Sequence, residues 1–507
     1  MSFNLATILR ESAQADPDKA VLRFAGSSVT YAELDSESGR FAAGLSGAGL
    51  GPGDVVAVQL PNFPEFLVAY FGTLKAGMTM LPLNPLLRAP EIAYHLADSH
   101  ARLLVTSPMF LDQAAKAAGD VPLVVVPMPG GEVPDGFRPF AALLADPSPD
   151  WVTGDIVATN ADDTAVIIYT SGTTGKPKGA ELTHFQLYMN CTVAGELFGA
   201  RADDTVLAVL PFFHVFGLSS VLNVSVRFGS TLSAVARFEA KPVLDVIETD
   251  GVTVVLGVPT MLQALMAEGT DGRDLARLRI AISGGASLPG DVLRAFEAKF
   301  GIVVLEGYGL SETASTSSFN SSAEARKVLS IGQPIWGVEM RVVDDQDRRL
   351  PVGADNIGEI VIRGHNVMKG YLGRPDDTAA AFRNGWFHTG DLGYVDDDGF
   401  FFIVDRSKDL VIRGGYNVYP REIEEVLYAH PAIAEAAVIG KPHESLGEEV
   451  VAVVALVPGE SLTSEDVIAY CKERLAMYKY PREVRFVDSL PKGPTGKILK
   501  AELRAVS

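Results

Sequence analysis

The sequence predicts an α/β protein with a large N-terminal domain of mixed sheets flanked by helices, plus a small C-terminal α+β domain on a hinge. The chain has 507 residues, which exceeds what one hydrophobic core usually supports. Most of it alternates short apolar runs with amphipathic stretches, as strands and helices do in α/β proteins. From Gly393 onward the pattern changes to β-rich runs separated by tight turns.

The alternation begins near Val55 with the run VVAVQL, and a helical pattern over Glu65 to Lys75 follows. Later apolar runs read AVIIYT, TVLAVLP, TVVLGVP, RIAISGG and IVVLEGYG, and each ends at glycine, proline or threonine. Ligands in such sheets bind beyond the carboxyl ends of the strands. The loops after these runs are therefore the candidate binding segments.

The C-terminal domain begins at a hinge that we place near Lys408. Before it, the run YVDDDGFFFIVDR predicts a hairpin with an Asp-Gly turn. A helix starting at Pro420, two apolar strands, a helix from Ser464 and a glycine-rich loop then complete a unit of normal domain size. The predicted domains are residues 1–405 and 406–507.

Composition restricts the classes of partner. The 63 acidic and 43 basic residues give a net charge of -20, which argues against a nucleic-acid partner. Cys191 and Cys471 have neither metal-ligand nor redox spacing, so we expect a reducing, cytoplasmic setting. The N-terminus lacks the apolar core of a signal peptide, and no apolar run reaches the roughly 18 residues of a membrane span. We expect no integral membrane segment.

The most informative segment is the loop from Tyr169 to Gly179, directly after an apolar strand. Its glycines let backbone N–H groups turn toward a phosphate, and its hydroxyls and lysines add donors and charge. It is not a Walker A loop, because Thr170 stands where that motif needs glycine and Pro177 follows Lys176. The residues predicted to hold phosphates are Thr170, Ser171, Gly172, Thr173, Thr174, Gly175, Lys176 and Lys178.

With this loop, the chain resembles the adenylate-forming superfamily over essentially its whole length. The superfamily contains acyl- and aryl-coenzyme A ligases, firefly luciferase and peptide-synthetase adenylation domains, and the bacterial fatty acyl-CoA ligases are the most similar. The resemblance implies ATP, Mg²⁺ and coenzyme A as cofactors and a small carboxylic acid as substrate. It also places Thr170 near the metal ion.

Further motifs follow in the order of the family. Glu306 to Glu312 reads EGYGLSE, in which Ser311 replaces the usual threonine but keeps the hydroxyl for the α-phosphate. The resemblance implies that Glu312 holds Mg²⁺, a cation that prefers oxygen ligands. Small residues after a strand would let adenine lie on the backbone, with Tyr308 on its other side. The residues implied to bind ATP or AMP here are Gly284, Gly285, Ala286, Gly307, Tyr308, Gly309, Ser311, Asp391 and Arg406, the last two through the ribose.

The last motif, PKGPTGKI, contains Lys497, which matches the catalytic lysine of the family. Attack of a carboxylate on phosphate brings two anions together, and an ammonium group can bridge them. Family members then rotate the small domain so that another face lines a coenzyme A tunnel. Lys408 matches the hinge of this rotation, and Gly414 and Gly415 match the coenzyme A face.

The acid is indicated mainly by what its predicted pocket lacks. The segment PFFHVFGL carries no acidic residue for an amino group, so we expect no α-amino acid substrate. His214 matches a position beside the substrate carboxylate, although a lone histidine near an apolar run also fits a structural role. The predicted pocket residues are His214, Val215, Phe216, Gly217, Val258 and Gly309.

We expect a medium- or long-chain fatty acid, with a hydroxycinnamate-like aryl acid as the alternative. A cavity filled by core side chains would instead take a short acid. A module that loads a carrier protein and an inactive nucleotide-binding scaffold are the other classes. The inactive scaffold is disfavoured because the chain retains Lys497, Glu312 and Thr170. For the assembly, a homodimer is one option.

Overall fold

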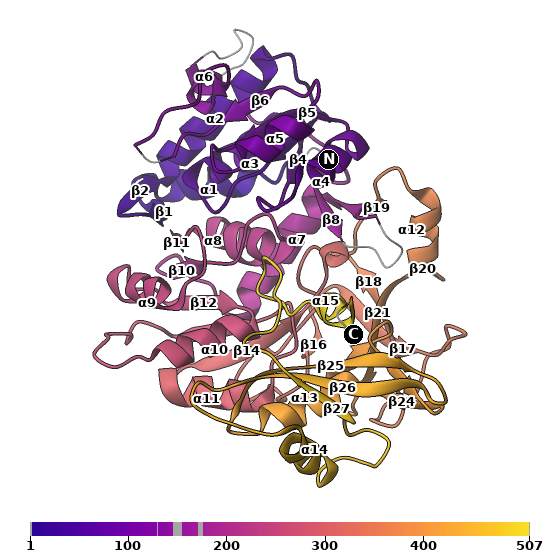
Figure 1. The fold of residues 1–507 in the computed structure, drawn as a ribbon. Helices are drawn as coiled ribbons and strands as arrows, with labels where there is room; N and C mark the ends of the chain where they lie inside the picture. The colour runs from indigo at the N-terminus through magenta and orange to yellow at the C-terminus, as the bar shows by residue number, and fades with distance from the viewer. Residues whose placement is uncertain (1–2, 129, 146–154, 171–175, 506–507) are drawn as a thin grey trace.

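The computed structural model describes residues 3–128, 130–145, 155–170 and 176–505. Figure 1 shows a large N-terminal part, indigo to orange, and a smaller C-terminal part, orange to yellow, packed against its lower side. Helices and strands alternate through the large part, so the predicted α/β class is confirmed. Within the described residues, no helix is both long enough and apolar enough to cross a membrane.

One sheet of the large part has the strand order β19-β9-β8-β4-β3-β5-β6-β7. Its strands from β3 to β6 are parallel, whereas β9 runs antiparallel to both β8 and β19. Strand β8 ends at the phosphate loop and β9 starts just after it. The strands are β3 (Val55–Val58), β4 (Thr79–Pro82), β5 (Ala101–Thr106), β6 (Leu123–Val125), β7 (Arg138–Pro139), β8 (Thr164–Thr170), β9 (Lys178–Thr183) and β19 (Gly370–Tyr371).

A second sheet has the order β16-β15-β14-β13-β12-β10-β11-β1-β2. Parallel pairing sets Gly257, Ser283 and Glu306 side by side, so three strands reach the same edge together. The loops after them therefore converge on one place. The strands are β1 (Ala20–Phe24), β2 (Ser27–Thr30), β10 (Thr205–Ala208), β11 (Thr231–Ala234), β12 (Val254–Gly257), β13 (Ile280–Ser283), β14 (Val303–Tyr308), β15 (Ser318–Phe319) and β16 (Gln333–Pro334).

The remaining strands form one further sheet in each part. In the large part the order is β17-β18-β21-β20, with β22 on β21, and in the small part it is β24-β23-β26-β25, with β27 on β26. The former contains β17 (Val338–Val343), β18 (Gly358–Gly364), β20 (Phe382–Arg383), β21 (Trp386–Val395) and β22 (Phe401–Arg406). The latter contains β23 (Val411–Arg413), β24 (Tyr416–Val418), β25 (Ile433–His443), β26 (Gly447–Leu456) and β27 (Glu483–Phe486).

The helices pack on the sheets through buried apolar faces. Thr30, Thr183 and Thr463 cap helices with capping boxes, and proline opens several others, as helix starts favour. The helices of the large part are α1 (Thr7–Ala15), α2 (Tyr31–Gly47), α3 (Pro64–Lys75), α4 (Ala89–Asp98), α5 (Leu111–Ala117), α6 (Phe140–Ala145), α7 (His184–Leu197), the π-helix η1 (Phe216–Asn223), α8 (Val224–Arg227), α9 (Ala240–Thr249), α10 (Pro259–Glu268), α11 (Gly290–Phe300), the 3₁₀ turn η2 (Ser311–Thr313) and α12 (Pro375–Ala381). Those of the small part are α13 (Pro420–Tyr428), α14 (Ser464–Lys472) and α15 (Lys500–Ala505).

The cores of the two parts are separate. One apolar cluster runs through the large part from Leu5 to Phe401, and another, from Val411 to Val484, fills the small part. Between them the chain turns at Ser407 to Asp409, where Ser407 and the predicted hinge residue Lys408 are exposed. The boundary at residues 405 and 406 stays a prediction, although the strands change sheet just after it.

Candidate active site

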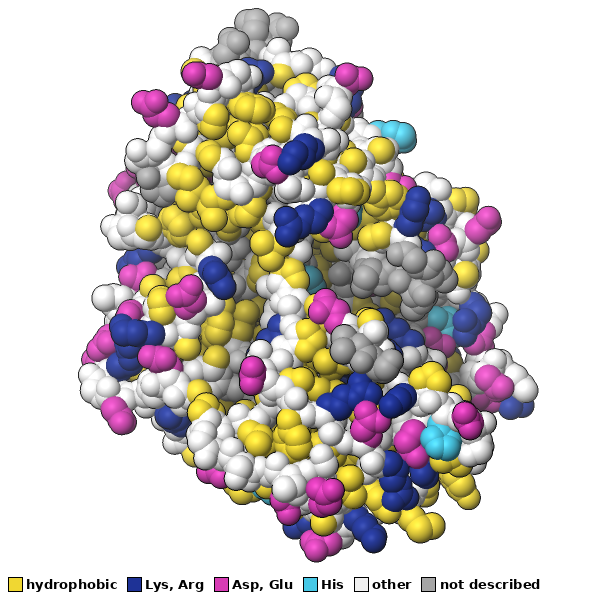
Figure 2. Space-filling view, in the orientation of Figure 1, with side chains coloured by type: hydrophobic (Ala, Val, Ile, Leu, Met, Phe, Trp, Pro, Cys, Tyr) yellow, Lys and Arg dark blue, Asp and Glu magenta, His cyan; other side chains and the backbone are white. Residues whose placement is uncertain are grey.

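A cavity of about 760 Å³ lies where the loops of the second sheet meet the C-terminal part. Figure 2 shows the molecular surface hollowed near its middle, with acidic and basic side chains interspersed on the same face. Loops after β12, β13 and β14, the start of η1 and a loop near the C-terminus line this cavity. Most of the predicted site residues that are described therefore surround one space.

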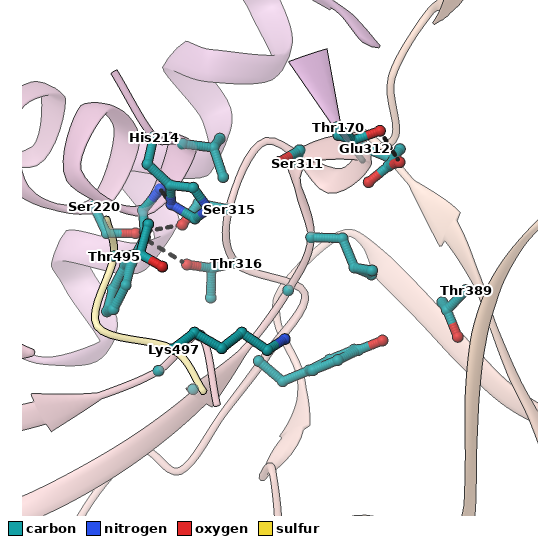
Figure 3. A pocket seen from close by; sticks show the side chains of 18 of the residues that line it. Thr170, His214, Ser220, Ser311, Glu312, Ser315, Thr316, Thr389, Thr495 and Lys497 are labelled. Atoms are coloured by element: carbon teal, nitrogen blue, oxygen red, sulfur yellow. Dashed lines mark hydrogen bonds between the residues drawn. The ribbon is translucent and has the colours of Figure 1, made fainter. Parts of the chain in front are cut away.

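One end of the cavity is lined by side chains that carry oxygen atoms. The hydroxyl of Thr170 donates to Glu312 Oε1 at 3.3 Å (Figure 3). The phenol of Tyr371 donates to the same oxygen at 3.0 Å. Burial and the Glu312 carboxylate raise the pKa of Tyr371, so its phenol stays protonated and keeps donating. Lys178 pairs with Asp377 at 2.6 Å. This end thus joins a carboxylate, hydroxyls and a lysine.

Five residues of the predicted phosphate loop, Ser171, Gly172, Thr173, Thr174 and Gly175, lie outside the described residues. The loop is described at its two ends only. Thr170 closes β8, and Lys176 lies 5.4 Å above the ring of Tyr94.

Another end of the cavity combines an aromatic ring with a charged pair. Tyr308 donates to Asp391 Oδ2 at 2.5 Å, while Arg406 Nε lies 3.0 Å from Asp391 Oδ1. Ser283 lines the cavity, and its buried hydroxyl has no hydrogen-bond partner among the described atoms. A buried hydroxyl without a partner is a donor available to a ligand. This end fits the predicted adenine and ribose contacts.

Lys497 reaches the cavity from the C-terminal part, and Figure 3 shows its side chain extended below Ser315 and Thr316. The preceding residue, Gly496, accepts a hydrogen bond from Thr260 at 2.8 Å and has φ +81°. Burial lowers the pKa of Lys497 to about 8, and the charge of Arg406 adds to the effect. The surroundings therefore destabilise the charged form of Lys497 until an anion binds beside it.

His214 faces the same space. Its Nδ1 accepts the backbone N–H of Phe216 at 3.3 Å, so the proton of the neutral ring sits on Nε2. Burial, together with the charge of Lys497, lowers the pKa of His214 to about 4. At neutral pH His214 is therefore an uncharged donor through Nε2–H.

The wall near His214 is apolar except for one hydroxyl cluster. Ser220 Oγ lies 2.8 Å from Ser315 Oγ and 3.4 Å from Thr316 Oγ1 (Figure 3). Ser220 belongs to η1, and π-helical turns are frequent at functional sites. Ser315 has φ +106°, a rare conformation for a residue with a side chain. The apolar wall residues include Ala194, Phe198, Leu210, Leu256, Ile282 and Phe319.

Several predicted residues lie elsewhere. Gly217 is buried, and a Cβ there would lie 2.2 Å from the carbonyl oxygen of Pro211, so the backbones pack directly against each other. Gly414 and Gly415 form the tight turn between β23 and β24, with φ of +58° and +82°. The predicted residues that do not line the cavity are Ala286, Gly217, Lys176, Asp391, Gly414 and Gly415. Asp391 still reaches the site through Tyr308 and Arg406.

Sequence reasoning missed Tyr371, and it placed Thr260, Ser220 and Ser315 only within candidate wall segments of the pocket, without their contacts. Tyr371 belongs to a short strand remote in sequence from Glu312, and Thr260 contacts a loop 236 positions away. A hydroxyl or phenol on an ordinary strand or helix carries no local signal of such a contact. Only the repeated serine and threonine after Glu312 could have drawn attention to the cluster.

Comparisons with known proteins cover the whole chain. Residues 9–372 match the family described as AMP-binding enzyme, and residues 422–497 match the AMP-binding enzyme C-terminal domain. The chain is 39% identical to a feruloyl-CoA synthase of an Amycolatopsis species, over 97% of this chain and 96% of that protein. It is 35% identical to a long-chain-fatty-acid–CoA ligase of Bacillus subtilis, over 98% and 94% of the two chains.

The solved structure of ATP-bound MatB from Rhodopseudomonas palustris matches with a TM-score of 0.90 at 36% identity, over 99% of both chains. The apo form of MatB from the same organism gives a TM-score of 0.81, over 100% of this chain and 99% of that chain. The chain is thus more similar to the ATP-bound form than to the apo form.

Proposed function

The chain belongs to the AMP-binding enzyme family, and from this premise we propose that it is an ATP-dependent acid–thiol ligase. A carboxylate oxygen of the acid attacks the α-phosphorus of ATP and expels pyrophosphate, which gives an acyl-adenylate. The thiol of coenzyme A then attacks the acyl carbonyl and expels AMP, and the thiol proton is released. The family supports both half-reactions, with ATP, coenzyme A and a carboxylic acid as partners.

One observation carries the proposal: Lys497, from the C-terminal domain, lies in the cavity that Thr170, Glu312, Tyr308 and His214 line from the large domain. The ammonium group neutralises the approaching carboxylate and the charge that develops on the phosphates. His214, neutral and protonated on Nε2, donates to the carboxylate and orients it without adding a second cation. The site thus assembles the groups that bring two anions together.

The residues present fit Mg²⁺. No cluster of three or more His, Cys, Asp or Glu capable of binding a metal occurs in the part of the chain that the structure describes. Mg²⁺ usually needs only one or two carboxylates, because substrate phosphates and water complete its shell. Glu312 and Thr170 would hold it, and the bound ion would neutralise charge on the phosphates.

For the thioester step, we propose that the small domain rotates about Lys408 and turns Gly414 and Gly415 toward the coenzyme A arm. Both glycines lie on an exposed turn; a Cβ at Gly415 would meet open space, and one at Gly414 would lie 3.4 Å from the Leu446 side chain. Positioning of the thiol beside a reactive anhydride then accounts for most of the rate.

Two acid classes fit the pocket. The apolar wall, with Phe198, Leu256 and Phe319, favours a medium- or long-chain fatty acid, as does the similarity to a long-chain-fatty-acid–CoA ligase. The buried hydroxyls of Ser220 and Ser315 favour a hydroxylated aryl acid, because they offer hydrogen bonds that an alkyl chain leaves unused. The similarity to a feruloyl-CoA synthase points the same way.

The experiment is an AMP-release assay with ATP and coenzyme A across fatty acids of increasing length and aryl acids with and without a phenolic hydroxyl. We expect turnover of an apolar acid with thioester product. A preference for hydroxylated aryl acids that Ser220→Ala abolishes would select the aryl class. Acyl-adenylate that accumulates without thioester would point to a carrier-protein acceptor, and absence of AMP with every acid would refute the ligase proposal.

A further inference from the structure

Helix α13 of the C-terminal domain docks on the large domain at the N-terminus of α11. The backbone N–H of Gly290, in the first turn of α11, donates to the Glu425 carboxylate at 3.3 Å. Helix α11 has Pro289 as its N-cap residue, without a side-chain cap. Free N–H groups and the helix dipole favour a negative charge there. Asp291 in the same turn pairs with Arg294, so the carboxylate that accepts the Gly290 N–H comes from the small domain.

Arg421 lies one turn before Glu425 on the same face of α13. Its guanidinium donates to the carbonyls of Ile403 at 2.6 Å and Leu329 at 3.4 Å, both in the large domain. Leu329 has φ +72°, which is rare for a branched side chain. Such a conformation persists only where the surrounding structure enforces it. The strained turn presents its carbonyl to Arg421.

A buried carboxyl of the large domain lies within the electrostatic reach of Arg421. Glu306, at the end of β14, is 4% exposed and accepts the backbone N–H of Leu288 at 3.3 Å. Burial raises its pKa to about 7, and the positive charge of Arg421 acts against this rise. Arg421 therefore supplies positive charge to Glu306 of the large domain and also lies 3.9 Å from Glu425. The large domain presents two carbonyls, a helix N-terminus and a nearby carboxyl, and α13 meets them with Arg421 and Glu425.

The same domain arrangement places Lys497 in the cavity. Thr260, at the start of α10, holds the carbonyl of Gly496 in the lysine loop, and α10 packs beside α11. The similarity to ATP-bound MatB exceeds that to the apo form, which fits an arrangement competent for adenylation. Rotation about Lys408 would separate Glu425 from Gly290 and Arg421 from Leu329.

We propose that Arg421 and Glu425 are positioning residues for the adenylation step, which hold the C-terminal domain in the orientation that keeps Lys497 in the cavity. They touch neither substrate nor reacting atoms. Their contacts form in this orientation and are released for the thioester step. The inference rests on the proposed two-step function, because it assigns these residues to one of its half-reactions.

The test compares Glu425→Ala with Glu422→Ala. Glu422 lies on the same helix but pairs with Lys479 of its own domain at 2.7 Å, so it is a matched control. Single-turnover formation of acyl-adenylate without coenzyme A measures the first step. Thiolysis of supplied acyl-adenylate by coenzyme A measures the second.

For Glu425→Ala we expect adenylation to slow by about 3- to 10-fold, as loss of a carboxylate at a helix N-terminus suggests. The KM for ATP should change less than about two-fold, because the residues predicted to bind ATP lie largely in the large domain. Thiolysis should be unchanged or faster. Glu422→Ala should leave the ratio of the two rates as in the parent enzyme.

An equal loss in both half-reactions, or an unchanged adenylation rate in a folded Glu425→Ala protein, would overturn the proposal. If that variant unfolds, the isosteric Glu425→Gln replaces it and should slow adenylation by about two- to three-fold, because the amide lacks the charge. An unchanged ratio in Glu425→Gln would be equally decisive. Failure of the parent enzyme to form acyl-adenylate from any acid would instead refute the proposed function.

Discussion

Removal of the Lys497 ammonium group should separate the two half-reactions. The pKa of Lys497 is lowered from 10.5 to about 8, mainly by burial. This difference corresponds to a destabilisation of the protonated lysine by about 3 kcal/mol before substrates bind. The negative charges of the carboxylate and the α-phosphate offset this destabilisation when they approach the ammonium group. Without the ammonium group, adenylation should therefore fall by about a hundred-fold.

The assay uses Lys497→Ala and Lys497→Arg with the best acid from the screen. Pyrophosphate release without coenzyme A reports adenylation, and thioester formation from supplied acyl-adenylate reports thiolysis. We expect the alanine variant to keep thiolysis within about three-fold of the parent, because this step does not bring a carboxylate against a phosphate. Arginine keeps the charge but is bulkier, so it should lose less than alanine. Equal losses in both steps for Lys497→Ala would refute the reasoning.

Three further outcomes follow from the same site. The kcat/KM of adenylation for ATP should fall as pH rises through about 8, because Lys497 loses its proton there; His214, with a pKa of about 4, should add no change above pH 5. A flat profile from pH 6 to 10 would contradict this assignment. Lys408→Pro, which restricts φ at the hinge, should leave adenylation intact and block thioester formation, and normal overall turnover would argue against the hinge. Gly496→Ala, at φ +81° and with a Cβ only 2.9 Å from the Val258 side chain, should slow adenylation about ten-fold and spare thiolysis, as partial-reaction rates would report.

Short sequence motifs predict most of the candidate site residues. The glycine, threonine and lysine pattern after β8 predicts a phosphate loop, because backbone N–H groups turn toward a ligand only where small residues allow it. Tyr308 and Glu312 belong to one short motif whose spacing is set by a single turn after a strand. Such groups lie close together in the fold because they lie close together in the chain.

The C-terminal domain shows the limit of local reasoning. Its size and its sheet follow from the change in pattern after Gly393, and Lys497 is marked by the motif around it. The orientation of this domain has no local signal. It depends on contacts such as Glu425 with Gly290 and Thr260 with Gly496, each between elements that are separate in sequence.

The α/β class and the two-part organisation follow from the sequence, which also predicts the groups that we propose to activate a carboxylate. Tertiary packing was needed to show that Thr260 donates to Gly496, that Tyr371 donates to Glu312 and that Ser220 faces Ser315. The physical reason is the range of the interactions. Hydrophobic periodicity and turn chemistry act within a few residues, whereas hydrogen bonds across a cavity require sheets and domains to pack in one particular orientation.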